Sequence, residues 1–167
     1  MIFGDKNTFA IEVEFSGIVP GGNDIFGRMV LWIGAISLGS WAERFVLGIA
    51  KVGLQRLLST NKINIKEFSG ESSESILTII DNYVFGESES LEDSRRRHLD
   101  YSNSIVCPGL GEPFDDELLV SLSDGDEVLF IWLDSKSQKV LRKRVSLDDI
   151  EGAVGAFKEE VDRQLRS

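Results

Sequence analysis

The chain has 167 residues, of which 42% are hydrophobic, so it is long and apolar enough to form one domain over residues 1–167 with a core of its own. Its single cysteine excludes an internal disulfide, and no run of ~18 apolar residues offers a membrane-spanning helix. The first ten residues lack the basic and apolar regions of a signal peptide, so the sequence predicts a cytoplasmic protein.

The formal net charge is −10, and the acidic excess is concentrated in the middle of the sequence. Residues 59–117 contain 5 basic and 13 acidic residues, whereas residues 1–58 contain 5 of each. An acidic segment of this kind repels nucleic-acid backbones and anionic lipid, and it attracts basic partners. The general alternative is that the acidic charge only keeps the protein soluble.

Two strands are predicted near the start of the chain. Residues 9–15 alternate apolar and acidic side chains, which indicates a strand with one buried face. Residues 29–38 carry no charge and are rich in β-branched and aromatic residues, as in a strand buried on both faces, although a buried helix has a similar pattern. Pro20-Gly21-Gly22 predicts a turn between them, so we expect a hairpin with residues 29–38 at the centre of the fold.

Two helices are predicted next. Ser40 is a candidate N-cap for a helix that begins at Trp41, although part of residues 41–50 could form a strand instead. This helix would bury Phe45, Ile49, Val52 and Leu57. Residues 61–70 are predicted to be extended, and a second helix follows, capped by Ser72 or Ser73 and ended by Gly86.

Residues 87–103 are the least typical stretch of the sequence. They combine an acidic half with Arg95-Arg96-Arg97 and His98, and they contain only three apolar anchors. We predict a long charged loop, and a loop of this length in a compact domain is usually functional or disordered. The three arginines lie among acidic residues, so local neutralisation explains them better than a nucleic-acid site does.

The last third of the sequence predicts an antiparallel meander followed by a helix. A short strand at 105–107 precedes three strands at 118–122, 128–133 and 139–145, and Asp124-Gly125 predicts the first hairpin turn. Four basic residues mark the 139–145 strand as an edge strand.

Ser146 is the predicted N-cap of a C-terminal helix with Ile150, Val154, Phe157, Val161 and Leu165 on its buried face. The sequence therefore predicts an α+β fold: a mostly antiparallel sheet with helices packed on one face, including a C-terminal helix.

The residues needed for nucleophilic catalysis are not evident. A Cys–His or Ser–His arrangement needs a base, and His98, the only histidine, is expected at the surface among arginines. Cys107 has no activating neighbour in the sequence, so we expect a buried, inert thiol. No phosphate-binding glycine motif is present. We therefore assign no catalytic residue and no cofactor.

The densest carboxylates are Asp115-Asp116-Glu117 and those of the turn at residues 124–127. Neither group has the spacing of a calcium loop, and a transition-metal site would normally contain more His or Cys. We therefore assign no metal site. A hydrolase that uses carboxylates, with a divalent metal at Asp115, Asp116 or Glu117, remains an alternative hypothesis.

The two ends of the chain resemble a known family. The matching segments are Phe3-Gly4-Asp5, Phe9-Ala10-Ile11 with Glu14, Gly27 leading into Leu31-Trp32-Ile33, Leu38-Gly39, and later Phe130-Ile131-Trp132 with residues 138–145 and the closing helix. Together they resemble the immunity proteins of bacterial polymorphic toxins, type forty-two. The charged loop at 87–103 has no counterpart in that pattern.

The resemblance implies a small cytoplasmic α+β protein that binds a cognate toxin domain and blocks it without catalysis. Many such toxins are basic nucleases, and an acidic inhibitor can cover a phosphate-binding surface. The residues we predict to contact the toxin are Glu87, Glu89, Glu92, Asp93, Asp115, Asp116 and Glu117. The remaining alternative is an adaptor that pairs through an exposed strand edge, which the basic residues of 139–144 disfavour.

Overall fold

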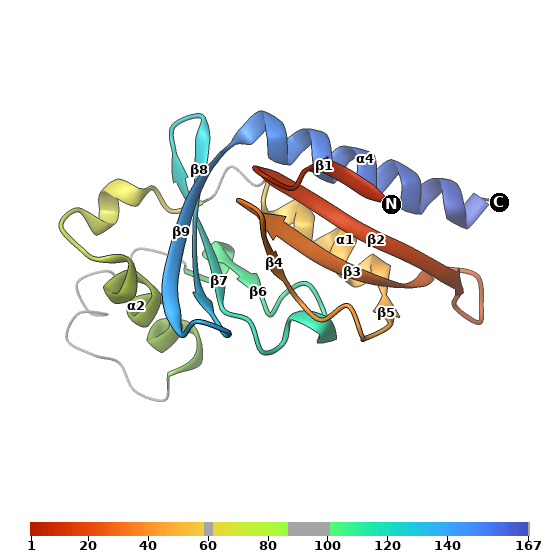
Figure 1. Cartoon of the computed structure of the whole chain (residues 1–167), viewed down its shortest axis with the longest axis horizontal. Helices are drawn as coiled ribbons and strands as arrows, with labels where there is room; N and C mark the ends of the chain where they lie inside the picture. Colours follow the sequence, from red (N-terminus) through yellow and green to blue (C-terminus); the bar gives the residue numbers. More distant parts are fainter. Residues whose placement is uncertain (59–61, 87–100, 167) are drawn as a thin grey trace.

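Figure 1 shows the computed structural model, which describes residues 1–58, 62–86 and 101–166. One antiparallel sheet contains β1 (Ile2–Asp5), β2 (Phe9–Ile18), β3 (Ile25–Ile33), β4 (Ile36–Leu38) and β5 (Phe45–Val46). The other contains β6 (Ile105–Cys107), β7 (Leu119–Asp124), β8 (Glu127–Asp134) and β9 (Lys139–Ser146). The helices are α1 (Leu47–Arg56), α2 (Ser73–Phe85) and α4 (Leu147–Arg166), with 3₁₀ turns η1 (Ile65–Phe68), η2 (Tyr101–Ser104) and η3 (Glu112–Phe114).

The α+β class, the antiparallel pairing and the C-terminal helix are confirmed, with the strands divided between two sheets. The predicted hairpin is also confirmed, since β2 pairs with β3 along its length. β1 pairs with β2 at the edge of the first sheet, a strand that the sequence analysis did not assign. β9 lies at the edge of the second sheet, as its basic residues predicted.

The predicted strand at 29–38 is wrong as one continuous element. β3 ends at Ile33, the chain turns at Gly34 and Ala35, and β4 returns with Ile33 opposite Ile36. Both turn residues have positive φ, 58° and 68°, the backbone conformation of a two-residue hairpin turn. The apolar run therefore encodes two short antiparallel strands.

The outer face of the first sheet is not fully buried either. Trp32 is half-buried there, and its indole N–H donates a hydrogen bond to the Glu12 carboxylate at 2.9 Å. Lys6 Nζ lies 2.6 Å from the same carboxylate and 4.1 Å from the centre of the Trp32 ring. The hydrogen bond from Lys6, with that from Trp32, lowers the pKa of Glu12 although partial burial opposes it. β3 thus buries one face against the helices and shares a polar cluster on the other.

The helix predicted from Trp41 is also wrong in its start and its buried face. The chain forms β5 at 45–46, as the strand alternative proposed, and α1 begins only at Leu47. Its buried residues are Leu47, Ala50, Gly53 and Leu54, whereas Ile49 and Val52 are 50% and 56% exposed. The reason is the cap: the Asp24 carboxylate accepts the Gly48 N–H at 3.0 Å, from a loop 24 residues away in sequence.

The predictions for the segment around α2 are confirmed in part. The Ser72 hydroxyl accepts the Ser75 N–H, so the predicted cap is confirmed, and Ile76, Leu77 and Ile80 are buried. Residues 65–68, predicted to be extended, form the turn η1 instead, because the Asn64 side chain caps it by accepting the Lys66 N–H.

The second sheet has apolar side chains buried on both faces. Val128, Phe130 and Trp132 of β8 join a hydrophobic cluster with residues of the first sheet, α1 and α4. Leu129 and Ile131 point the other way, into a second cluster with α2 and η1. Phe9 and Phe130 stack with ring centres 5.8 Å apart and connect the two sheets.

The C-terminal helix α4 spans both sheets, as Figure 1 shows along the top of the molecule. The Ser146 hydroxyl accepts the Asp149 N–H, and Ile150, Val154, Phe157 and Val161 are buried, as predicted. Lys51 of α1 pairs with Asp162 of α4. In the described residues no helix is long and apolar enough to cross a membrane.

Candidate functional site

A groove runs between α2 and the second sheet. Two adjoining hollows of about 280 and 190 Å³ share Asp81 and Leu118 and together form it. We call it the acidic groove; its carboxylates are Glu74, Asp81, Asp115, Asp116 and Glu117, and its apolar lining includes Phe85, Leu118, Leu133 and Val140. Among the described residues that line it there is no Lys or Arg.

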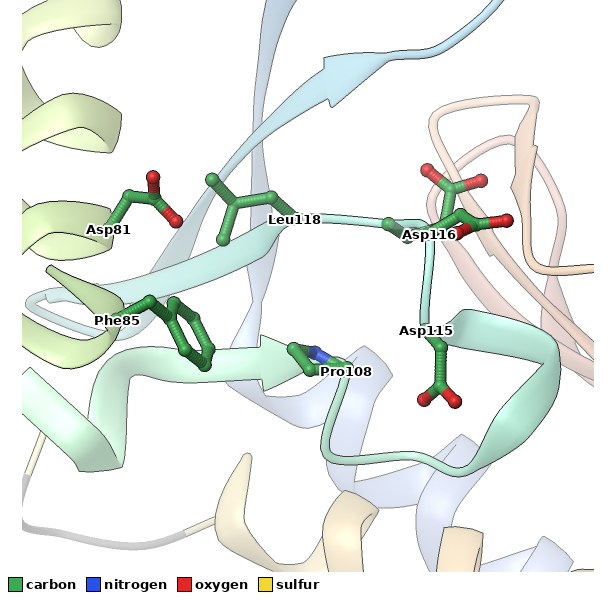
Figure 2. A pocket seen from close by; sticks show the side chains of 7 residues that line it. Asp81, Phe85, Pro108, Asp115, Asp116 and Leu118 are labelled. Carbon is green, nitrogen blue, oxygen red and sulfur yellow. The ribbon is translucent and has the colours of Figure 1, made fainter.

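α2 supplies one wall of the acidic groove. Glu74, Thr78, Asp81 and Phe85 follow one another at steps of four, three and four residues, which places them on one helical face. That face is next to the buried face of Ile76, Leu77 and Ile80. Figure 2 shows Asp81 and Phe85 projecting from α2 toward Leu118 and Pro108.

The other wall is residues 115–118, held in place by η3. Phe114 is fully buried and packs edge-on against Phe45, with ring centres 6.4 Å apart. The Glu117 N–H donates to the Phe114 carbonyl at 3.1 Å. This anchored turn brings the exposed Asp115 and Asp116 to the mouth of the groove, while Glu117 and Leu118 are half-buried.

The electrostatics of this wall centre on Glu117. Burial raises the pKa of the Glu117 carboxyl, opposed by a hydrogen bond from the Gly39 backbone and by Lys136, and supported by Asp134 and Asp116. Burial, with the Glu117 charge nearby, also raises the pKa of the Cys107 thiol well above its usual range. Cys107 is fully buried, as predicted, so its thiol stays protonated at neutral pH.

The carboxylates of this wall do not form a metal-binding group. In Figure 2 the Asp115 side chain points away from Asp116. In residues 1–58, 62–86 and 101–166 there is no group of three or more His, Cys, Asp or Glu side chains placed to hold a metal ion. The divalent-metal hypothesis at Asp115, Asp116 or Glu117 therefore has no geometric support.

Three of the seven residues predicted to bind a partner lie in the acidic groove: Asp115, Asp116 and Glu117. The other four, Glu87, Glu89, Glu92 and Asp93, lie outside the described residues, as does His98.

The contribution of α2 to the acidic groove was not predicted from the sequence. A signal was available, because Glu74 and Asp81 are seven residues apart in a predicted helix and therefore share a face. Phe85, at 55% exposure, is the apolar end of that face.

Comparison with known proteins finds two matches, each of which covers most of the chain. Residues 1–160 match the family model described as immunity protein 42. The chain is also similar to the crystal structure of CdiI from Burkholderia dolosa AUO158, with a TM-score of 0.64 and 17% sequence identity over 96% of this chain and 99% of that chain. At this identity the likeness shows a shared fold. No curated protein matches the sequence.

Proposed function

The chain belongs to the immunity protein 42 family, and from this premise we propose that it works in the cytoplasm by binding a cognate toxin domain through the acidic groove, without catalysis of its own. The observation that carries the site assignment is the combination of five carboxylates with exposed apolar side chains in one groove. The toxin of this proposal presents a basic surface, as a nuclease does where it binds phosphate.

The composition of the groove suits a protein partner. Phe85 and Leu133 are 55% and 39% exposed, and such side chains contribute most when a partner covers them. The carboxylates around them favour Lys and Arg in the partner and speed its approach, because long-range attraction raises association rates at low salt. Apolar anchors would then hold the complex while the charges select the partner.

The test is co-expression of this chain with the protein encoded beside its gene, scored by growth rescue and by a co-purifying complex. We expect rescue by a stoichiometric complex whose association rate falls as salt is raised. The absence of both growth rescue and a co-purifying complex would contradict the immunity role.

The site is tested with the double variant Asp81→Lys/Asp115→Lys, which reverses one charge on each wall. Loss of favourable contacts and new repulsion should weaken binding at least about tenfold. The control is Glu159→Lys with Glu151→Lys, which makes the same change in net charge at exposed positions of α4. Equal affinity of the two double variants would rule out the acidic groove and leave the immunity role standing.

A further inference from the structure

A second hollow, of about 300 Å³, lies between η1, the start of α2 and the strands β8 and β9. Among the described residues, those that line it with a charge are Lys66, Arg142 and Arg144 and one carboxylate, Glu71. We call it the basic pocket. In a chain of net charge −10, a hollow with three cations and one anion is a local reversal of sign.

The basic pocket and the acidic groove lie on the same side of the molecule. Side chains alternate along a strand, so Val140, Arg142 and Arg144 of β9 share a face. Val140 lines the acidic groove, whereas Arg142 and Arg144 line the basic pocket. α2 also borders both, with Glu74 in the groove and Ser73 in the pocket. The face formed by α2 and β9 is therefore acidic at one end and basic at the other.

The described residues neutralise the cations of the basic pocket only in part. Arg144 Nε lies 2.5 Å from Asp124 and 4.0 Å from Glu127, which holds this guanidinium at the rim. The Glu71 carboxylate accepts the Ser75 hydroxyl at 2.5 Å. Within the part of the chain that the structure describes, no ion pair joins Lys66 or Arg142 to a carboxylate.

The apolar lining of the basic pocket suits a side chain of a partner protein better than a bare ion. Leu129 and Ile76 line the pocket beside the arginines, which gives it an apolar surface. A carboxylate-bearing segment of a protein matches this combination of cations and apolar surface, whereas the net charge of the chain opposes nucleic acid.

We propose that the basic pocket binds an acidic segment of the same toxin domain whose basic surface occupies the acidic groove. This inference rests on the proposed function and adds a second contact of opposite sign. The two contacts together fix the orientation of the toxin along the α2–β9 face, because a toxin turned end for end would set like charges against each other.

The test measures the affinity of the purified toxin domain encoded beside this gene for the double variant Lys66→Glu/Arg142→Glu. We expect at least about tenfold weaker binding. The control is Lys143→Glu with Lys158→Glu, which makes the same change in net charge and should stay within about twofold of the wild type. Lys143 is on the opposite face of β9, where its stem lies beside Gly34, and Lys158 is exposed on α4.

The outcomes separate the two proposals. Equal affinity of the double variant and its control would overturn the basic pocket while the wild-type complex keeps the immunity role intact. If the wild type forms no complex, the proposed function fails and the pocket assignment fails with it. The single variant Arg142→Gln repeats the test without charge reversal and should weaken binding by a smaller factor, should the double variant fold poorly.

A further arm distinguishes a small anion from a protein segment. Inorganic phosphate is added to the free wild-type protein and to Lys66→Glu/Arg142→Glu, and the thermal midpoint of each is followed. Stabilisation of the wild type alone by phosphate, with toxin affinity unchanged in the variant, would assign the pocket to an anion and overturn the proposal. Competition of phosphate with the toxin only in the wild type would support it.

Discussion

At the scale of single residues, Glu117 is the group whose pKa we expect partner binding to change. Its carboxyl is half-buried, and burial raises its pKa above the ordinary value of 4.5. A Lys or Arg placed against it by a partner would favour the ionised form and lower the pKa again. Binding of a basic toxin should therefore release a proton from Glu117 at pH values between the pKa of its carboxyl in the complex and the raised pKa in the free protein.

We expect toxin affinity to increase as pH rises through that range and to level off once Glu117 is ionised in the free protein. In Glu117→Gln this part of the pH dependence should vanish, while titration of other groups is retained. The free energy of unfolding gives a second readout. The folded state binds this proton more tightly than the unfolded state, so ionisation of Glu117 lowers the stability of the wild type as pH rises. The free energy of unfolding of Glu117→Gln should therefore increase relative to that of the wild type over the same pH range. Parallel pH profiles of the two proteins, in both measurements, would contradict this assignment.

At the scale of residues, the candidate site was predictable on one side only. Asp115, Asp116 and Glu117 are adjacent in the sequence, so their density is visible without a structure. Asp81 joins them only because α2 packs on the second sheet. The sequence carries the helical spacing of the α2 face, but it does not carry the packing that turns this face toward residues 115–117.

At the scale of elements, α1 can pack closely on residues 109–110 because residue 53 of the helix is a glycine. Gly53 lies on the buried face of α1, and an added Cβ would be 2.5 Å from the Gly109 carbonyl oxygen and 2.8 Å from Leu110 Cδ2. A Cβ added at Gly152 of α4 would meet open space. We expect Gly53→Ala to lower the free energy of unfolding by about 1–3 kcal/mol through overpacking.

The matched variant Gly152→Ala should raise the free energy of unfolding by up to about 1 kcal/mol, because alanine is the better helix former. Urea denaturation of both variants checks the pair. Stabilisation by Gly53→Ala would show that α1 does not pack closely on residues 109–110.

The same glycine explains why the buried face of α1 was predicted wrongly. Large apolar residues at 45, 49, 52 and 57 suggested one face, yet the helix turns small residues, Ala50 and Gly53, toward the core. Its cap comes from Asp24, which local sequence patterns cannot reveal. In contrast, the caps of α2 and α4, Ser72 and Ser146, are local and were predicted correctly, as was the buried face of α4.

At the scale of the whole molecule, the two sheets depend on a common cluster. Phe9 of β2 and Phe130 of β8 are both fully buried and stacked. Neither sheet can lose its partner without exposing apolar surface, so we expect the chain to unfold in one cooperative transition. Tryptophan fluorescence reports on both sheets, through Trp32 of β3 and Trp132 of β8, and should coincide with far-UV circular dichroism.

Phe130→Ala should lower the free energy of unfolding by about 3–5 kcal/mol and keep the two signals coincident. Phe85→Ala, at an exposed position, is the control and should change it by no more than about 0.5 kcal/mol. Separate transitions for the two signals would instead show that the sheets unfold independently.

The double-sided burial of β8 has a consequence for how this protein can diversify. From Val128 to Trp132 every side chain belongs to one of the two hydrophobic clusters, so substitutions there lower the free energy of unfolding. The charged residues of the α2–β9 face are mostly exposed and tolerate exchange at little cost to the fold. On the proposal that this face binds the toxin, exchange of its charged residues changes which toxin is bound, while β8 beneath it stays the same.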